Sequence, residues 1–177
     1  MIDDKFNHAI EIVLRHEGGL SDNKNDPGGI TRFGISLRSL KALNIDINDD
    51  GRINAEDIRA LSVDAAKGIY KTQWWDKYKY DRIENIDIAT KIMDLSVNMG
   101  PSQAHKLAQR AANRTQLKPI VVDGILGTHS FRAINRAPVE LYLREINDIA
   151  AYFYKALARD NPELNEFLKG WLNRIYD

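Results

Sequence analysis

Apolar side chains recur along most of the chain at the spacing of helices, and turn residues separate these stretches. Positions 6, 9, 10 and 13 form one stripe before Gly18-Gly19, and positions 88, 89, 92, 95 and 99 form another before Gly100-Pro101. This period places apolar side chains on one helix face, and glycine or proline ends a helix. The pattern predicts a mainly α-helical protein. We expect helices over residues 6–17, 37–43, 63–78, 88–99, 102–113 and 138–161, and a last one that ends near residue 176.

Two segments do not follow the helical period. Residues 20–36 contain the turn sequence Asp-Pro-Gly-Gly, so we expect a loop with short β pairing around 30–35. Residues 46–57 are polar and predict an inserted loop. A weak boundary at Gly100-Pro101 separates residues 1–98 from a helical region at 99–177, and we expect both to pack into one globule.

Charge and composition narrow the classes of partner. The chain has 25 basic and 25 acidic residues, so no net field attracts nucleic acid. No stretch approaches the roughly 20 apolar residues of a membrane span, so we expect no membrane insertion. The first residues are acidic and amphipathic, unlike a secretory signal. We therefore expect synthesis in the cytoplasm without a signal peptide. We also expect a monomer.

Two acidic residues lie just before and within the turn-rich segment at 20–36, namely Glu17 and Asp26. Glu17 lies on the apolar face of the first helix, where shielding from water should raise its pKa, as a general acid requires. Asp26 lies in a polar, glycine-rich turn and should stay ionised, and Thr31 supplies a hydroxyl that can position water. Two acids in opposite surroundings are typical of glycoside hydrolysis. On spacing alone, a solvated glutamate before an ordinary turn is the more common interpretation.

A set of ordered motifs resembles one enzyme family over nearly the whole chain. The segments are Glu17-Gly18-Gly19, then Asp26, Gly28-Gly29, Thr31 and Gly34-Ile35, the pair Trp74-Trp75, residues 92–100, Val122-Asp123-Gly124 to Gly127, and Phe167, Gly170-Trp171-Leu172 and Arg174. Together they resemble glycoside hydrolase family 108, the lysozyme-like N-acetylmuramidases of phage lysis systems and bacterial secretion activators.

The resemblance implies a lysozyme-like α-helical fold with a small β-hairpin region and a helical C-terminal segment that binds peptidoglycan. It implies cleavage of the β-1,4 bond between N-acetylmuramic acid and N-acetylglucosamine, with Glu17 as the acid and with Asp26 and Thr31 as the water-activating or charge-stabilising pair. A phage endolysin would reach the periplasm through holes made by a holin. Residues of these types are more often part of the core or of structural contacts, but as candidate sugar contacts we name Trp74, Trp75, Tyr80, Asp94 and Asn98.

The inserted loop fits the EF-hand pattern from Asp46 to Asp57. Six positions of this pattern supply oxygen ligands, Gly51 makes the sharp turn, and Ile53 anchors the loop. We therefore expect a structural Ca²⁺ site, although a solvated acidic turn has the same composition. The predicted ligands are Asp46, Asn48, Asp50, Arg52 through its carbonyl, Asn54 and Asp57.

Two alternatives to an endolysin remain open at this point. One is a bacterial muramidase that assists protein secretion. The other is a calcium-stabilised module that binds the cell wall or a protein without catalysis, which the loop at 46–57 favours and the intact motif around Glu17 does not.

Overall fold

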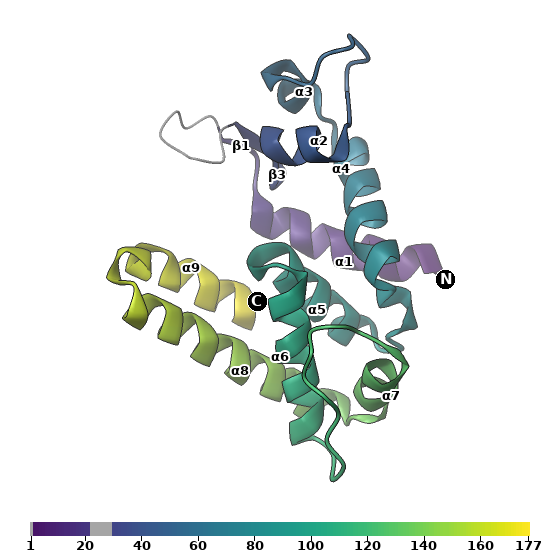
Figure 1. Cartoon of the computed structure of the whole chain (residues 1–177), viewed down its shortest axis with the longest axis vertical. Coiled ribbons are helices and arrows are strands. Elements are labelled where there is room, and N and C mark those ends of the chain that lie inside the picture. The colour runs from purple at the N-terminus through teal and green to yellow at the C-terminus, as the bar shows by residue number, and fades with distance from the viewer. Residues whose placement is uncertain (1, 22–29) are drawn as a thin grey trace.

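The chain folds into a mainly α-helical protein with one small sheet, as the hydrophobic pattern predicts (Figure 1). The computed structural model describes residues 2–21 and 30–177. The first helix, α1 (Ile2–Glu17), packs against α5 (Ile86–Met99) through its apolar stripe. Ala9, Ile10 and Val13 on that stripe are fully buried. Gly18 follows with a φ of +73°, a conformation that glycine adopts without steric cost and that ends the helix.

A short antiparallel sheet follows α1. Its strands are β1 (Leu20–Ser21), β2 (Thr31–Arg32) and β3 (Ile35–Ser36), in that order. The turn between β2 and β3 is Phe33-Gly34, with φ values of +53° and +74°. Positive φ at both central residues is the geometry of a tight hairpin turn that follows the twist of the strands. The predicted hairpin region is confirmed.

The segment after the sheet carries the polar loop and the aromatic pair. The predicted helix over 63–78 is helical, but most of its second half is a π-helical segment rather than a regular α-helix. Ser62 caps it by accepting a hydrogen bond from the Ala65 N–H at 3.1 Å. The elements are α2 (Leu37–Leu43), α3 (Ala55–Ala60), α4 (Val63–Tyr70), the π segment η1 (Lys71–Asp76) and the 3₁₀ turn η2 (Tyr80–Arg82).

The second half of the chain is a helical layer on the other side of α5. The long helix α8 and the last helix α9 lie side by side (Figure 1), and α6 packs between α5 and α8. The helices are α6 (Pro101–Arg114), α7 (Thr128–Arg136), α8 (Val139–Asp160) and α9 (Asn165–Tyr176), with the 3₁₀ turn η3 (Pro162–Leu164) before α9. The sequence pattern predicted α6, α8 and α9 but neither α7 nor the turn η3.

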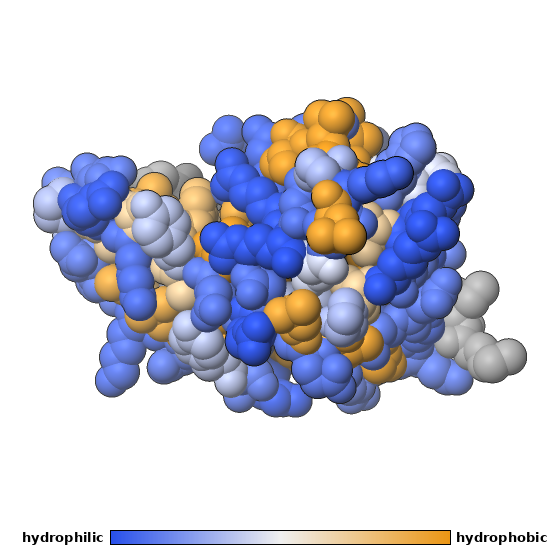
Figure 2. Space-filling view, turned by 90° about the horizontal axis from the view of Figure 1, so that it is seen from below, coloured by the Kyte–Doolittle hydropathy of each residue, from blue (hydrophilic) through white to orange (hydrophobic). Residues whose placement is uncertain are grey.

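One hydrophobic core runs through both halves of the described chain, because buried side chains of α1, α5, α6 and α8 belong to the same cluster. The surface seen in Figure 2 is mostly hydrophilic, with apolar groups scattered over it rather than joined in one broad patch. No helix in the described part of the chain combines the length and the apolar character of a membrane span.

Candidate active site

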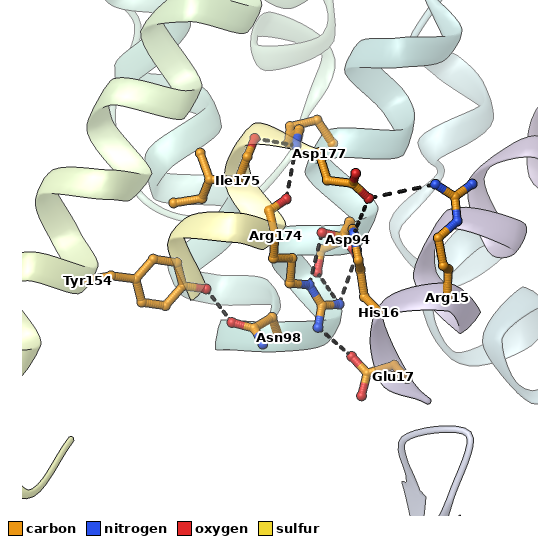
Figure 3. Close-up of polar contacts among 10 residues, drawn as sticks. Arg15, His16, Glu17, Asp94, Asn98, Tyr154, Arg174, Ile175 and Asp177 are labelled. Atoms are coloured by element: carbon orange, nitrogen blue, oxygen red, sulfur yellow. Dashed lines mark hydrogen bonds and ion pairs between the residues drawn. The ribbon is translucent and has the colours of Figure 1, made fainter. Parts of the chain in front are cut away.

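Glu17 closes α1 and points toward the C-terminal helix (Figure 3). Its side chain is 18% exposed, and its Oε1 accepts a hydrogen bond from Arg174 Nη1 at 2.7 Å. The sequence predicted shielding by apolar neighbours. The side chain is partly shielded as expected, and an arginine from the other end of the chain, which the sequence did not predict here, also holds the carboxyl group.

Arg174 connects Glu17 on α1 to Asp94 on α5. Its Nε and Nη2 donate to the two carboxylate oxygens of Asp94 at 3.0 and 2.8 Å, and its Nη2 also approaches the Asp94 carbonyl at 3.3 Å. The side chains of Arg174 and Asp94 are only 9% and 2% exposed, respectively. A guanidinium in this two-pronged arrangement fixes both distance and orientation, which a single contact cannot do.

His16 completes the charged cluster from the other side. Its Nδ1 lies 3.0 Å from Asp94 Oδ1, and its Nε2 lies 3.1 Å from Asp177 Oδ2 (Figure 3). Burial would raise the pKa of Asp94, but the hydrogen bond to His16 and the charge of Arg174 outweigh it, so the pKa is lowered. The hydrogen bond to Asp94 raises the pKa of His16. The cluster therefore favours a negative Asp94 beside a positive His16.

The C-terminal end of α9 is tied to α5 as well. Lys91 Nζ donates to the carbonyl oxygens of Ile175 and Arg174 at 2.8 and 3.4 Å. A cation at this end of a helix satisfies carbonyl groups that have no partner inside the helix. Arg174 is thus held in place by its backbone as well as by its side chain.

The hairpin turn touches Glu17 from the opposite side to Arg174. A Cβ atom added at Gly34 would lie 2.5 Å from Glu17 Oε2 and 2.6 Å from the Tyr70 hydroxyl oxygen. The Tyr70 hydroxyl in turn donates to the Phe33 carbonyl at 2.9 Å. Only glycine therefore fits at position 34, for its φ and for the close approach to the acid.

These contacts give the two carboxylate oxygens of Glu17 different surroundings. Oε1 is engaged by Arg174, whereas Oε2 faces the hairpin turn at Gly34. Because its two oxygens differ in this way, the carboxyl group is fixed in orientation, and a general acid must be positioned toward the proton acceptor.

The two predicted partners of Glu17 have different outcomes. Asp26 lies outside the described residues. Thr31 lies on β2, opposite Ser21 and Ser36 in the sheet, and within the described chain no hydrogen bond joins it to Glu17. The roles of both residues remain predictions.

The predicted sugar-contacting aromatics are in part core residues. Trp75 and Tyr80 are fully buried, so the prediction that they contact sugar is wrong. Trp75 packs edge-on against Tyr80 at 6.1 Å between ring centroids, and the Tyr80 hydroxyl is 2.8 Å from His105 Nε2. Trp74 is partly buried, with its ring 5.2 Å from that of Tyr70.

The two polar residues of α5 that were predicted to contact sugar, Asp94 and Asn98, have different surroundings. Asp94 is 1% exposed and engaged by Arg174 and His16, so the structure does not place it in contact with a substrate. Asn98, one turn further on, is partly exposed and accepts a hydrogen bond from the Tyr154 hydroxyl through Oδ1 (Figure 3). It lines an open groove of about 920 Å³ beside α9.

The predicted calcium loop makes a network of its own backbone contacts. Asp46 Oδ2 accepts from the Gly51 N–H at 2.7 Å, and the fully buried Asp57 accepts from the N–H groups of Ile47 and Asn54 at 2.8 and 2.7 Å. Asp46 Oδ1 is buried without a hydrogen-bond partner. The described residues contain no group of three or more acidic, histidine or cysteine side chains arranged to hold a metal. The remaining predicted ligands are Asn48, which accepts from the Asp50 N–H, Asp50, which accepts from the Arg52 N–H, and Arg52 and Asn54.

Sequence reasoning did not identify Arg174 and His16 as members of the site. Arg174 entered the sequence analysis only as part of a closing motif, and His16 did not enter it. The available signal was Asp94, because an acid on an otherwise apolar helix stripe needs a buried cation.

Comparisons with known proteins bear on the family and the fold of the chain. Residues 10–100 match the family model described as Glycosyl hydrolase 108, and residues 103–176 match the model described as Predicted Peptidoglycan domain. No curated protein sequence matches the chain significantly. Among solved structures, the chain is similar to that of SagA from Brucella abortus, with 26% identity over 98% of this chain and 91% of that chain and a TM-score of 0.78.

Proposed function

Because the chain belongs to the glycosyl hydrolase 108 family and is a glycoside hydrolase that acts on peptidoglycan, we propose that it is an N-acetylmuramidase. The bond cleaved is the β-1,4 linkage between N-acetylmuramic acid and N-acetylglucosamine. The observation that carries the proposal is Glu17, a partly buried carboxyl group held by Arg174 on one side and by the turn at Gly34 on the other.

In the proposed mechanism Glu17 protonates the leaving glycosidic oxygen from Oε2. Arg174 keeps Oε1 in place and so sets the direction of the proton. Attack by water on the opposite face completes hydrolysis, with Asp26 and Thr31 as the residues that would activate the water or stabilise the positive charge of the sugar. Their part rests on the resemblance of the motif.

The test compares Glu17→Gln with Glu11→Gln, an exposed glutamate on the same helix. Loss of a general acid slows such reactions by about 10²–10⁴-fold, so the first variant should release almost no reducing ends from purified peptidoglycan, and the second should match the parent. Mass spectrometry of the products should find N-acetylmuramic acid at the new reducing end. Near-parent activity of Glu17→Gln, or N-acetylglucosamine at that end, would contradict the proposal.

The biological setting that we propose is phage lysis of a Gram-negative host. In that setting the enzyme is made in the cytoplasm, and a holin opens the membrane so that it reaches the periplasmic cell wall. Expression with and without a holin gene checks this: the culture should lyse only when both are present. Lysis without the holin would favour a route of its own across the membrane.

We also propose that the loop from Asp46 to Asp57 holds Ca²⁺ as a structural ion. Two features support the proposal: Asp46 Oδ1 is buried with no partner, and Gly51 has a φ of +80° at the sharp turn of the motif. The ion would neutralise the acids of the loop and tie it to the helix that begins at Ala55. It would take no part in the reaction.

A further inference from the structure

A groove runs along α9 and is lined in part by His16 and Arg174, two members of the charged cluster that holds Glu17. Its volume is about 920 Å³, and it is open to solvent along α9. Most of the residues that line it belong to the C-terminal segment, with Asn98 on α5 and with Arg15 and His16 on α1 completing the lining. We call it the α9 groove, and it is lined by Asn98, Phe167, Gly170, Trp171, Asn173 and Arg174, among others.

An aromatic platform forms one part of this groove. The Trp171 ring stacks on Tyr154, with centroids 4.9 Å apart and planes at 22°, and Phe167 lies 5.9 Å from Trp171. Tyr154 anchors the stack from α8 and is itself buried. Phe167 is 49% exposed, so its ring presents an apolar face to solvent. Flat apolar faces beside polar groups are typical of small-molecule and sugar sites.

A hydrogen-bonding group stands next to the platform. Asn98 Oδ1 accepts from the Tyr154 hydroxyl, which fixes the orientation of the amide. Within the described chain the Asn98 amide N–H groups have no hydrogen-bond partner, so they remain available to a ligand carbonyl. The acetamido group of an N-acetylated sugar supplies such a carbonyl next to its ring.

The absence of a side chain at Gly170 leaves space on the face of α9 that lines the groove. Gly170 lies in the middle of a helix, where glycine lowers stability relative to alanine. An added Cβ would meet nothing within 4 Å, and its φ is not in the left-handed region, so neither packing nor backbone geometry requires a glycine. Position 170 is one turn before Arg174 and beside Trp171. Any side chain there would stand up next to the ring and narrow the groove.

We propose that the α9 groove binds N-acetylated hexosamine units of the glycan strand. Phe167 and Trp171 form the surface on which a sugar ring stacks. Asn98 donates a hydrogen bond to the acetamido carbonyl, and Gly170 leaves room for the sugar beside Trp171. The assignment rests on the proposed function, since it places one stretch of that substrate next to Glu17. Arg174 belongs to both sites, because it lines the groove and bonds to Glu17.

The test separates binding from cleavage. Calorimetry in the Glu17→Gln background measures the affinity for N-acetylchitohexaose and for cellohexaose, which has the same backbone without acetamido groups. Phe167→Ala and Gly170→Leu should each weaken N-acetylchitohexaose binding at least tenfold, and cellohexaose should bind at least tenfold more weakly than N-acetylchitohexaose. Tyr152→Ala, an exposed aromatic on α8 that does not line the groove, is the matched control and should bind as the parent does.

Two further readouts exclude a merely structural effect. Gly170→Ala and Gly170→Leu should raise the melting temperature while Gly170→Leu weakens binding, because a better helix former is expected to stabilise α9. With Glu17 intact, Phe167→Ala should raise KM and leave kcat within about twofold.

Unchanged affinity in Phe167→Ala and Gly170→Leu, equal affinity for the two oligosaccharides, or no binding at all would overturn the assignment. A Glu17→Gln protein that still cleaves peptidoglycan would overturn the proposed function instead. The outcomes for the groove and for the catalytic acid are therefore distinguishable.

Discussion

Replacement of Arg174 by alanine is expected to lower both stability and activity. The change leaves Asp94, whose side chain is 2% exposed, with His16 as its remaining cationic partner. Removal of one partner from a buried ion pair costs about 3–5 kcal/mol, because an uncompensated charge stays in the interior. His16 still compensates part of that charge, and Glu17 is partly exposed, so we expect about 3 kcal/mol.

Thermal unfolding measures this loss directly. For a protein of this size, 1 kcal/mol corresponds to about 2–4 °C in melting temperature, so Arg174→Ala should melt roughly 6–12 °C below the parent. Arg159→Ala is the matched control: Arg159 also pairs with an aspartate at 2.8 Å, but both side chains are mostly exposed. Its melting temperature should equal that of the parent.

A double variant separates stability from positioning. Arg174→Met combined with Asp94→Leu replaces the buried pair by apolar side chains, which often restores stability. Activity should stay low, because Glu17 has lost the partner that holds Oε1. Arg174→Lys keeps the charge without the two-pronged geometry and should recover only part of the activity. An Arg174→Ala protein with the parent's melting temperature and turnover would refute the reasoning.

Three other changes test further contacts. Gly34→Ala should lower the free energy of unfolding in urea by about 2–4 kcal/mol and remove most of the activity, because the new Cβ collides with Glu17 Oε2 and φ is positive at this position. Gly18 has a similar φ but open space around it, so Gly18→Ala should lower the free energy of unfolding by only about 1–2 kcal/mol. The raised pKa of His16 means that its protonated form contributes stability below about pH 6.5, and that the contribution is lost as pH rises through the folded-state pKa. The stability difference between the parent and His16→Gln should thus be largest near pH 5.5 and shrink toward about pH 8.5. Calcium at one hundred times its dissociation constant should stabilise the chain by about 2.7 kcal/mol through the loop at 46–57, and identical melts in calcium and in EGTA would remove that site.

The helices that the sequence predicts well are those with strong stripes and clear stops. The helices α1 and α5 end where Gly18 and the Gly100-Pro101 pair require, and both stripes are buried as expected. The helix α7 escaped prediction because its nine residues are mostly polar or β-branched. Phe131 and Ile134 are its large buried side chains, and packing against α6 makes it helical where local preference does not.

The candidate site was predictable only in its local part. Glu17 follows from a short motif, whereas Arg174 meets it across 157 positions of sequence, a pairing that no local pattern encodes. The prediction that Trp75 and Tyr80 contact sugar is wrong for a different reason. Aromatic side chains are frequent in cores and in sugar sites alike, and only burial distinguishes the two.

The charged cluster has a consequence for how the two matched regions relate. The first region supplies Glu17 and Asp94, and the second supplies Arg174, so neither contains the whole cluster. Lys91 fixes the end of α9 to α5, which keeps the arginine in register with the acid. A binding domain on a flexible tether could not hold a guanidinium at 2.7 Å from a carboxyl group. The C-terminal region therefore supplies one wall of the candidate site, and in our two proposals catalysis and binding of the glycan strand depend on the same helix.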